Sequence, residues 1–332
     1  MLMLRLWLAF AKYRRPMSTC LWNIHPWKVA CAAYIGVLAY RVYSPEKWRA
    51  QHILEYLLTE YTPLESGVRS IYWSTCLHNG LIRKTEHRIM NINMDNEWIF
   101  FKEKADEAGT PLTEQQLSQF MIFYECLIEK NKVMNLTAIT ELHDVIIKHF
   151  LDSLALSRVC SLSQEDRVLD MGTGAGFPGI PLKIMYPDTE FVLADSLNKR
   201  ILFLEEVIRG CSLKKIEAVH SRAEDLARDK SYRDSFSVCV SRAVASLPVL
   251  SEYCLPFVKT GGCFISYKSG NIDMEIEQSE HALKTLRGKT ERCEKFTLPD
   301  TDAERSLVVI RKTGATPAAY PRKAGMPSKQ PL

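Results

Sequence analysis

The stretch VLDMGTGAGFPGIPLKI, residues 168–184, joins an apolar run that ends at Asp170 to a loop with four glycines between positions 172 and 179. An apolar run followed by such a loop is typical of the first strand and the first turn of a parallel α/β sheet. Glycine adopts positive φ without strain and lets a ligand approach the main chain. Because ligands bind at the carboxyl ends of the strands in such sheets, the stretch predicts a binding site at this loop.

The spacing of the glycines distinguishes between cofactors. A dinucleotide fingerprint reads G-x-G-x-x-G, whereas Gly172, Gly174 and Gly176 form G-x-G-x-G with Asp170 two residues before them. This loop resembles motif I of the class I S-adenosylmethionine-dependent methyltransferases. In those enzymes an acid at the end of the second strand binds the ribose, and Asp195 follows nineteen residues after Gly176, where that acid belongs. On these residues alone, a dehydrogenase with a similar loop is the alternative.

The pattern after this loop predicts alternating strands and helices. Strands are expected near 167–171, 190–194, 215–219, 235–241, 262–267, 290–297 and 305–311, and helices near 179–186, 198–209, 222–228, 246–258 and 274–287. Such alternation indicates an α/β fold, Rossmann-like and of the class I methyltransferase type, with a mostly parallel seven-stranded sheet covered by helices on both faces. Because no helix separates the last two strands, we expect an antiparallel pair at the end of the sheet.

We place this α/β domain at residues 161–312. The segments before and after it do not show the same alternation of strands and helices. Residues 94–160 are expected to form a small helical cap. Thr113 and Gln116 can make a capping box at the start of one helix, a second helix is expected over 141–158, and a turn is expected between them. The tail 313–332, rich in proline and basic residues, is expected to be irregular.

Residues 1–93 differ from the rest of the chain. They contain five of the six tryptophans and 12 Lys and Arg against 5 Asp and Glu, a net charge of +7, whereas the remaining residues carry −3. Their apolar run 29–40 has twelve residues, and a membrane span needs about twenty. We interpret the segment as preceding a translation start at Met94; a genuine, poorly ordered extension or a membrane-touching anchor are the alternatives.

Cysteine usage and composition suggest an intracellular protein. The ten cysteines form no CxxC pair and have no metal-ligand spacing with the eight histidines. Scattered cysteines of this kind are usually reduced and buried. We therefore expect a cytoplasmic protein without a metal site and without stable membrane association.

Several stretches together resemble one family, the ribosomal RNA small subunit methyltransferase G family, once called glucose-inhibited division protein B. The resemblance covers about 94–332, and nothing in that family matches 1–93. One departure is a serine in YKSG, 267–270, where the family more often runs from lysine straight into glycine. The stretches that carry the resemblance are NLTAI (135–139), KHFLDSL (148–154), LDMGTGAGFPGIPLKI (169–184), DSLNKRILFL (195–204), SRAVASL (241–247) and YPRKAGMPSKQPL (320–332).

The resemblance implies methyl transfer from S-adenosylmethionine to N7 of a guanine, numbered 527, in 16S ribosomal RNA. Guanine N7 has an available lone pair, so the reaction needs no general base, and Arg242 would act by positioning. Ala223 and Glu224 lie just beyond the third strand, where this fold holds the adenine; a plain helix N-terminus is the other interpretation. The cofactor-binding residues implied are Asp170, Gly172, Gly174, Gly176, Phe177, Asp195, Ala223, Glu224 and Arg242.

Arg242 and the pair His149 and Asp152 can each have a role in the site or a role in holding the fold together. Arg242 ends the fourth strand and can contact cofactor or guanine, or it can pair with Asp170 or Glu224. His149 and Asp152 lie three residues apart on one helical face. They can tie the helix to the body of the protein, or form a wall of the guanine pocket.

An RNA substrate also requires cations that neutralise phosphates. We expect 16S rRNA or a small ribosomal subunit particle as the partner of a monomeric enzyme. A methyltransferase acting on another RNA or on a small molecule, and a ribosome-assembly factor that has lost catalysis, are the rival functions. The candidate RNA-binding residues are Lys148, His149, Lys268, Arg311, Lys312, Arg322, Lys323 and Lys329, with Arg200 and Arg305 as further basic candidates.

Overall fold

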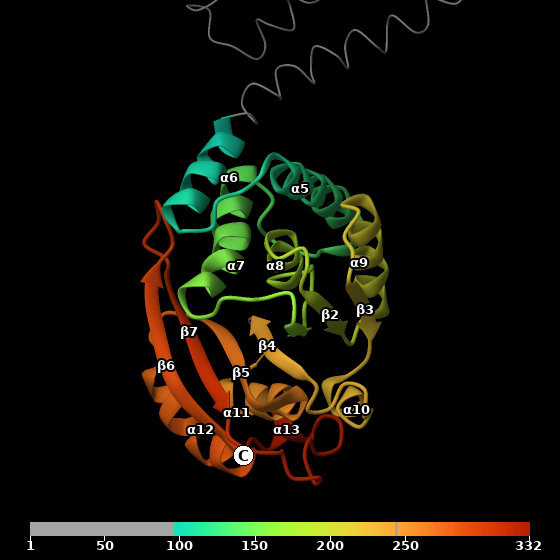
Figure 1. Cartoon of the computed structure of the whole chain (residues 1–332), viewed down its shortest axis with the longest axis vertical. Coiled ribbons are helices and arrows are strands. Elements are labelled where there is room, and N and C mark those ends of the chain that lie inside the picture. Colours follow the sequence, from blue (N-terminus) through green and yellow to red (C-terminus); the bar gives the residue numbers. More distant parts are fainter. Residues whose placement is uncertain (1–95, 243–244) are drawn as a thin grey trace, which may run out of the picture. The chain divides into compact units, whose positions relative to one another are not determined.

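A mixed seven-stranded sheet forms the centre of the computed structural model, which describes residues 96–242 and 245–332. The strands are β1 (Arg167–Met171), β2 (Glu190–Asp195), β3 (Ile216–His220), β4 (Phe236–Arg242), β5 (Val258–Ser269), β6 (Gly288–Thr297) and β7 (Glu304–Lys312). They lie in the order β3-β2-β1-β4-β5-β7-β6 (Figure 1). The first five are parallel, and β7 is antiparallel to both β5 and β6. The predicted seven-stranded sheet and its antiparallel end are confirmed.

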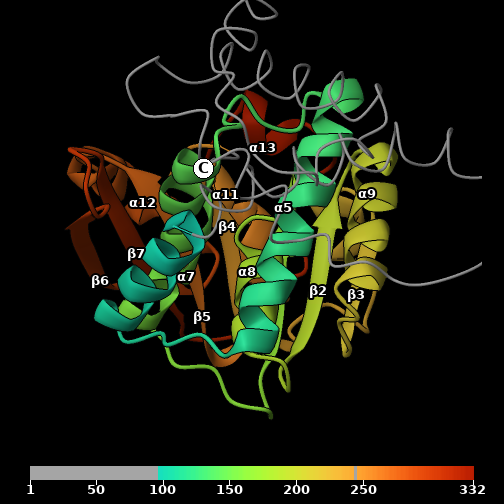
Figure 2. The same cartoon turned by 90° about the horizontal axis from the view of Figure 1, so that it is seen from above.

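Helices cover both faces of this sheet (Figures 1 and 2). The side chains of β2 show why, since Leu193 packs into one apolar cluster and Val192 and Ala194 pack into another. Successive strand residues point to opposite faces, so a strand buried on both sides needs helices on both. One face carries α5 (Glu114–Met134), α8 (Gly179–Met185) and α9 (Asn198–Gly210); the other carries α10 (Ala223–Leu226), α11 (Leu247–Cys254), the short η3 (Leu255–Phe257), α12 (Asp273–Thr285) and α13 (Met326–Lys329).

The helical run predicted over 141–158 contains an irregular centre. It consists of α6 (Leu142–Val145), the π-helical η1 (Ile146–Leu151), α7 (Asp152–Leu154) and the 3₁₀-helical η2 (Ala155–Arg158). A π-helix is rare, and it is frequently found at a functional site. Here it carries two of the predicted site residues, Lys148 and His149.

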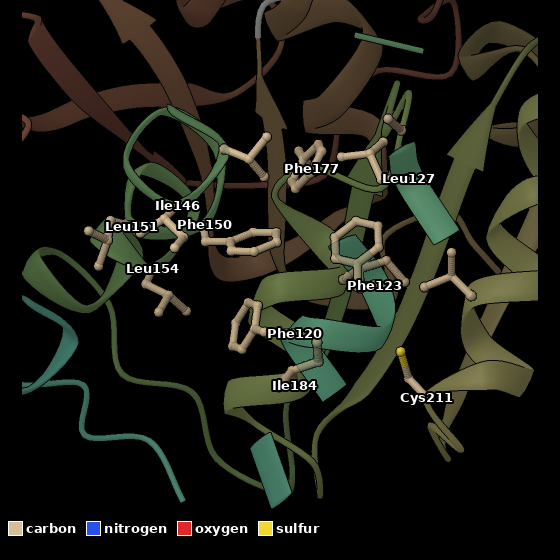
Figure 3. Packing of buried hydrophobic residues seen from close by; sticks show 14 of the residues in the cluster. Phe120, Phe123, Leu127, Ile146, Phe150, Leu151, Leu154, Phe177, Ile184 and Cys211 are labelled. Atoms are coloured by element: carbon tan, nitrogen blue, oxygen red, sulfur yellow. The ribbon is translucent and has the colours of Figure 1, made fainter. Parts of the chain in front are cut away.

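The N-terminal helices share one apolar core with the sheet. Phe150 of η1 lies 4.9 Å from Phe120 of α5, measured between ring centroids, and Phe123 lies 5.1 Å from Phe177 in the glycine-rich loop (Figure 3). Trp98, in a helix over 96–107, packs into the same cluster. The segment predicted as a helical cap is therefore a layer of the sheet domain, and it contacts the loop that the sequence marks as a site.

The start and end of α5 follow local chemistry. The Gln116 N–H donates to Thr113 Oγ1 over 3.3 Å, and the Thr113 N–H donates to Gln116 Oε1 over 2.9 Å, which confirms the predicted capping box. Asn135 ends the helix with φ of 49°. The following turn is held by Asn131, whose side-chain amide bonds both the N–H and the C=O of Thr137 at 2.9 Å.

The tail after β7 has little regular structure, as predicted, but it is bound to the domain. Arg233 donates to the carbonyl oxygens of Thr316 and Tyr320, at 2.9 and 3.0 Å. Tyr253 Oη lies 2.8 Å from Ser328 Oγ. Backbone groups that lack helix or strand partners are thus satisfied by side chains of the body.

Three expectations about the N-terminal segment, the start at Met94, the extension and the membrane anchor, fall on residues outside the described part. Within residues 96–242 and 245–332, no helix has the length and apolar character that a bilayer crossing requires. The cysteines of the same part of the chain are free thiols.

Candidate functional site

The glycine-rich loop after β1 has the backbone that its sequence requires. Gly172, Gly174 and Gly176 have φ of 73°, 63° and 93°, in the region that other residues rarely adopt. The N–H groups of Gly172 and Thr173 donate to Ala194 O at 2.9 and 3.2 Å, which fixes the loop against β2. A Cβ at position 176 would lie 2.7 Å from Ile180 Cγ1. The loop is therefore a close-packed main-chain cradle at the carboxyl edge of the sheet.

Asp170 lies buried beneath this loop. Its Oδ2 accepts a hydrogen bond from the Gly179 N–H at 2.8 Å, and a Cβ on Gly179 would lie 2.7 Å from the same oxygen. Burial raises the pKa of Asp170 to about 6. Asp170 Oδ1 and Thr173 Oγ1 are buried, and neither has a hydrogen-bond partner within the described residues. Buried acceptors of this kind are suited to a hydrogen-bond donor on a ligand in the cradle.

Asp195 lies at the end of β2 and contacts the same loop. Its Oδ2 accepts from the Gly174 N–H and from Arg200 Nη1, both at 3.0 Å, and its Oδ1 accepts from the Leu197 N–H at 2.9 Å. The carboxylate is 3% exposed, and Arg200 is its ion-pair partner. Asp195 therefore lies beside the cradle, in the position that the sequence predicted for an acid near the ribose.

Arg242, at the end of β4, joins the sheet to the π-helix. Its Nη1 donates to Asp152 Oδ2 at 2.7 Å and to Lys148 O at 3.3 Å, and its Nη2 lies 3.3 Å from His149 Nδ1. The guanidinium carbon is 5.1 Å from the centroid of the Phe177 ring. Of the structural pairings considered for this arginine, the two with Asp170 and Glu224 are wrong, because the carboxylate within reach is Asp152.

His149 stacks on the glycine-rich loop. Its ring lies 4.5 Å from the Phe177 ring, with 24° between the planes, and its Nε2 lies 2.9 Å from Thr137 Oγ1. Burial, and then the charge of Arg242, lower the pKa of His149 to about 4. The ring is therefore neutral at physiological pH. Of the two interpretations given for His149 and Asp152, the contacts of both residues with Arg242 support the one in which they tie their helix to the sheet.

Ala223 and Glu224 lie in α10, directly after β3, and both are buried. The Glu224 carboxylate accepts a hydrogen bond from the Gly325 N–H at 2.9 Å. The predicted adenine-binding position is thus in direct contact with the tail. No sequence pattern indicates this contact, which joins residues 101 positions apart.

Some of the basic residues predicted to bind RNA have protein partners. Lys148 pairs with Asp144 at 2.8 Å. Lys268 donates to Ala245 O and to Glu275, both at 2.7 Å, and Arg311 pairs with Glu291 at 2.6 Å. Lys323 and Lys329 of the tail are exposed.

Burial contradicts the predicted RNA contact of Lys312, and an ion pair with a buried carboxylate engages Arg322. Lys312 is 1% exposed, and its ammonium donates to Thr316 Oγ1 at 2.6 Å, to Leu255 O, and to Asp234 at 3.3 Å. Arg322 forms a two-pronged ion pair with the buried Glu252, with Nη2 to Oε2 at 2.6 Å and Nε to Oε1 at 3.0 Å. The partners of both cations are groups of the protein itself. We therefore assign Lys312 and Arg322 structural roles.

Sequence reasoning missed two features of the site. It assigned no partner to Arg242 in the helix, although Asp152 stands four residues after Lys148 in the quoted stretch KHFLDSL. It placed Arg305 only among general basic candidates, and Arg305 Nε lies 3.2 Å from Asp152 Oδ1. Among the described residues, no group of three or more His, Cys, Asp and Glu side chains could hold a metal ion.

Comparisons with known proteins identify the family of this chain. A family model described as rRNA small subunit methyltransferase G matches residues 116–308. The chain is 56% identical over 232 residues to the ribosomal RNA small subunit methyltransferase G of Lachnoclostridium phytofermentans, which covers 70% of this chain and 96% of that protein. It is 48% identical over 239 residues to the protein of the same name from Desulforamulus reducens, covering 72% and 100%. A solved structure of a putative methyltransferase from Bacillus halodurans is 15% identical, with a TM-score of 0.38 over 49% of this chain and 99% of that one.

Proposed function

The chain belongs to the rRNA small subunit methyltransferase G family, and from this premise we propose that it methylates N7 of one guanine in 16S rRNA, the guanine numbered 527. Its methyl donor is S-adenosylmethionine. The observation that supports the proposal most strongly is the match to whole relatives, 96% and 100% of their length, over the residues that build the cradle and the Arg242 contacts. The proposed substrate would be a ribosomal particle or its RNA in the cytoplasm.

The residues of the cradle fit this cofactor. S-adenosylmethionine, when bound, supplies a methyl group on a positively charged sulfur, together with an amino group, a ribose and an adenine. The three glycines with positive φ leave the main chain accessible. Asp195 can accept from ribose hydroxyls, and the unpartnered Asp170 Oδ1 can accept from a donor such as the amino group. Ala223 and Glu224 are buried just after β3, where main-chain groups can read an adenine edge.

The reaction proposed here requires positioning more than proton transfer. Guanine N7 is already nucleophilic, so the protein has to hold it in line at near-attack distance. Arg242 and the His149–Phe177 stack present flat surfaces at the carboxyl edge of the sheet, and such surfaces suit an unstacked RNA base. The neutral His149 has no role as a general base in this scheme.

The electrostatics of the site suit a base that becomes cationic. Methylation at N7 leaves a positive charge on the guanine. Arg242 alone would oppose this charge, but its guanidinium is paired with the buried Asp152. Asp195 and Asp170 add negative charge on the other side of the loop. The field at the target is therefore moderated by carboxylates that the fold holds in place.

Methyl transfer to rRNA tests the proposal directly. The full chain is incubated with labelled S-adenosylmethionine and small-subunit RNA or particles that lack the modification, and the label is mapped by N7-specific chain scission. We expect label at one guanine N7. Label at another atom, or no transfer to either substrate while the cofactor still binds, would overturn the proposed target.

The role of Asp195 in cofactor binding gives a quantitative prediction. Asp195→Ala should weaken S-adenosylmethionine binding by about 1–3 kcal/mol, since it removes a charged hydrogen-bond acceptor. Titration calorimetry measures the effect. Asp195→Asn keeps an oxygen for the Gly174 N–H and should show a smaller loss.

Arg200→Met is the matched control for this prediction. It removes the ion pair with Asp195 but leaves the carboxylate in place, so binding should change less than threefold. Unchanged binding in Asp195→Ala would contradict the ribose role. An equal loss in Arg200→Met would place the effect in the ion pair.

A further inference from the structure

Asp152 lies between two arginines that come from different strands. Arg242 Nη1 is 2.7 Å from its Oδ2, and Arg305 Nε is 3.2 Å from its Oδ1. The Asp152 side chain is 4% exposed, while Arg242 and Arg305 are 14% and 23% exposed. One buried carboxylate therefore faces two partly exposed guanidinium groups: it accepts a hydrogen bond from Arg242, whereas its contact with Arg305 is an ion pair without hydrogen-bond geometry.

The sheet topology explains how the two arginines meet. Arg242 is the last residue of β4, and it is in register with Tyr267 of β5. Two residues further along β5, Ser269 is in register with Arg305 of β7. Because β7 runs antiparallel, its amino end returns to the edge at which the parallel strands end. The same edge carries the glycine-rich loop.

The surrounding helix fixes Asp152 at this point. Tyr267 Oη, which is buried, donates to Ser153 O at 2.8 Å, and Ser153 Oγ donates to His149 O at 2.5 Å. The first bond ties the helical run to β5 beside Asp152, and the second closes the helical turn that contains Asp152. The carboxylate can therefore define where both guanidinium groups lie.

The charges of this group are not balanced. Two guanidinium groups face one carboxylate, and the nearby His149 is neutral at physiological pH. Arg305 Nη1 donates to Glu304 O at 2.9 Å, whereas in the described residues its Nη2 has no hydrogen-bond partner. A guanidinium that keeps a nitrogen free to donate is suited to a phosphate oxygen, to which it adds both a hydrogen bond and a positive charge.

We propose that Asp152 is a positioning residue that holds Arg242 toward the target base and Arg305 toward a phosphate of the same RNA. The proposal rests on the proposed function and adds a phosphate subsite to it. Asp152 itself contacts neither cofactor nor RNA. It sets the distance between Arg242, which faces the target base, and Arg305, which faces the RNA phosphate.

The test compares four variants of the full chain with wild type: R305Q, R305K, D152N and, as the control, R167Q. Arg167 is the first residue of β1, at the opposite edge of the sheet, where it pairs with Glu190 and is about as exposed as Arg305. For each protein, the KM for unmodified small-subunit RNA and kcat are measured at salt concentrations from 50 to 200 mM. The Kd for S-adenosylmethionine and the melting temperature are measured alongside.

A phosphate contact has a specific signature in these data. R305Q should raise the RNA KM about fivefold to tenfold with kcat within twofold, and should reduce the salt slope of log KM by about 1. R305K keeps the charge, so the salt slope should return toward wild type while KM stays raised. D152N should lower kcat at least tenfold and also raise KM, because it releases both arginines. The cofactor Kd should change less than threefold in R305Q and R305K.

The outcomes separate this proposal from the proposed function. If wild type transfers methyl groups to rRNA but R305Q behaves like R167Q in KM and salt slope, the phosphate subsite is wrong. If D152N keeps the wild-type kcat, Asp152 does not position Arg242. If D152N fails to fold, R305Q and R305K still decide the phosphate contact, because they leave the Asp152–Arg242 pair intact. Wild type that binds S-adenosylmethionine but methylates no small-subunit RNA would overturn the proposed function instead.

Discussion

Asp170→Asn makes the protein more stable at pH 8, by about 1–3 kcal/mol, and reduces its affinity for S-adenosylmethionine about tenfold or more. The gain in stability arises because the fully buried carboxylate has a pKa raised to about 6 by loss of hydration. The ordinary value for the group is 3.8, and each unit corresponds to about 1.4 kcal/mol. Asparagine has a similar shape, can still accept from the Gly179 N–H and carries no charge.

The sign of the pH dependence follows from the same shift. Between about pH 4 and pH 6 the folded state binds a proton at Asp170 that the unfolded state has released, so wild-type stability falls as pH rises through this range. Above about pH 6 the destabilisation is complete. The difference between Asp170→Asn and wild type should therefore be largest above pH 6 and should vanish toward pH 4.

Urea denaturation at pH 8 and pH 4.5, with calorimetric titration of the cofactor, measures both effects. Asp166→Asn is the control, because Asp166 precedes the same strand and has a lowered pKa: hydrogen bonds from Ser163 outweigh the opposing effect of burial. This variant should lose stability at pH 8. An Asp170→Asn protein that is less stable than wild type at pH 8, or that binds the cofactor normally, would contradict the roles given to the orphaned carboxylate oxygen.

Arg322→Met destabilises the protein by about 3–5 kcal/mol, because it leaves Glu252 charged and buried without its ion-pair partner. The Glu252 side chain is 1% exposed, and it accepts three hydrogen bonds from the Arg322 side chain and one from the Arg322 N–H. After the substitution only the main-chain bond remains. Chemical denaturation of the variant and of wild type gives the difference.

Two further variants make this result specific. Lys323→Met changes the exposed neighbouring residue and should alter stability by no more than about 0.5 kcal/mol. Adding Glu252→Gln to Arg322→Met removes the uncompensated charge and should recover a large part of the loss. If Arg322→Met keeps wild-type stability but weakens RNA binding, the structural role is wrong and the original expectation of an RNA contact returns.

Features that depend on neighbouring residues could be predicted from the sequence. Short sequence motifs identify the glycine-rich loop, the capping box at Thr113 and the acid at Asp195. The order of strands and helices follows from the periodicity of apolar residues. The family resemblance added Phe177 and Arg242, which now lie 5.1 Å apart.

Features that depend on distant pairing could not. Lys312 and Arg322 belong to a basic stretch that suggests an RNA surface, but Lys312 is buried beside Asp234 and Arg322 is paired with the buried Glu252, and both partners lie more than sixty positions earlier. Arg305 reaches Asp152 only because β7 runs antiparallel. The Glu224–Gly325 contact likewise joins two segments that have no sequence pattern in common.

The π-helical stretch Ile146–Leu151 also limits how the length of this chain can change. A π-helix is in effect an α-helix that has gained a residue, and loss of one residue from the stretch would let regular α-helical bonds form. Each residue of an α-helix turns the chain by about 100°, so Asp152 would rotate away from Arg242 while the helix itself survived. We therefore expect a single-residue insertion or deletion in this segment to displace Asp152 from Arg242 without breaking the helix.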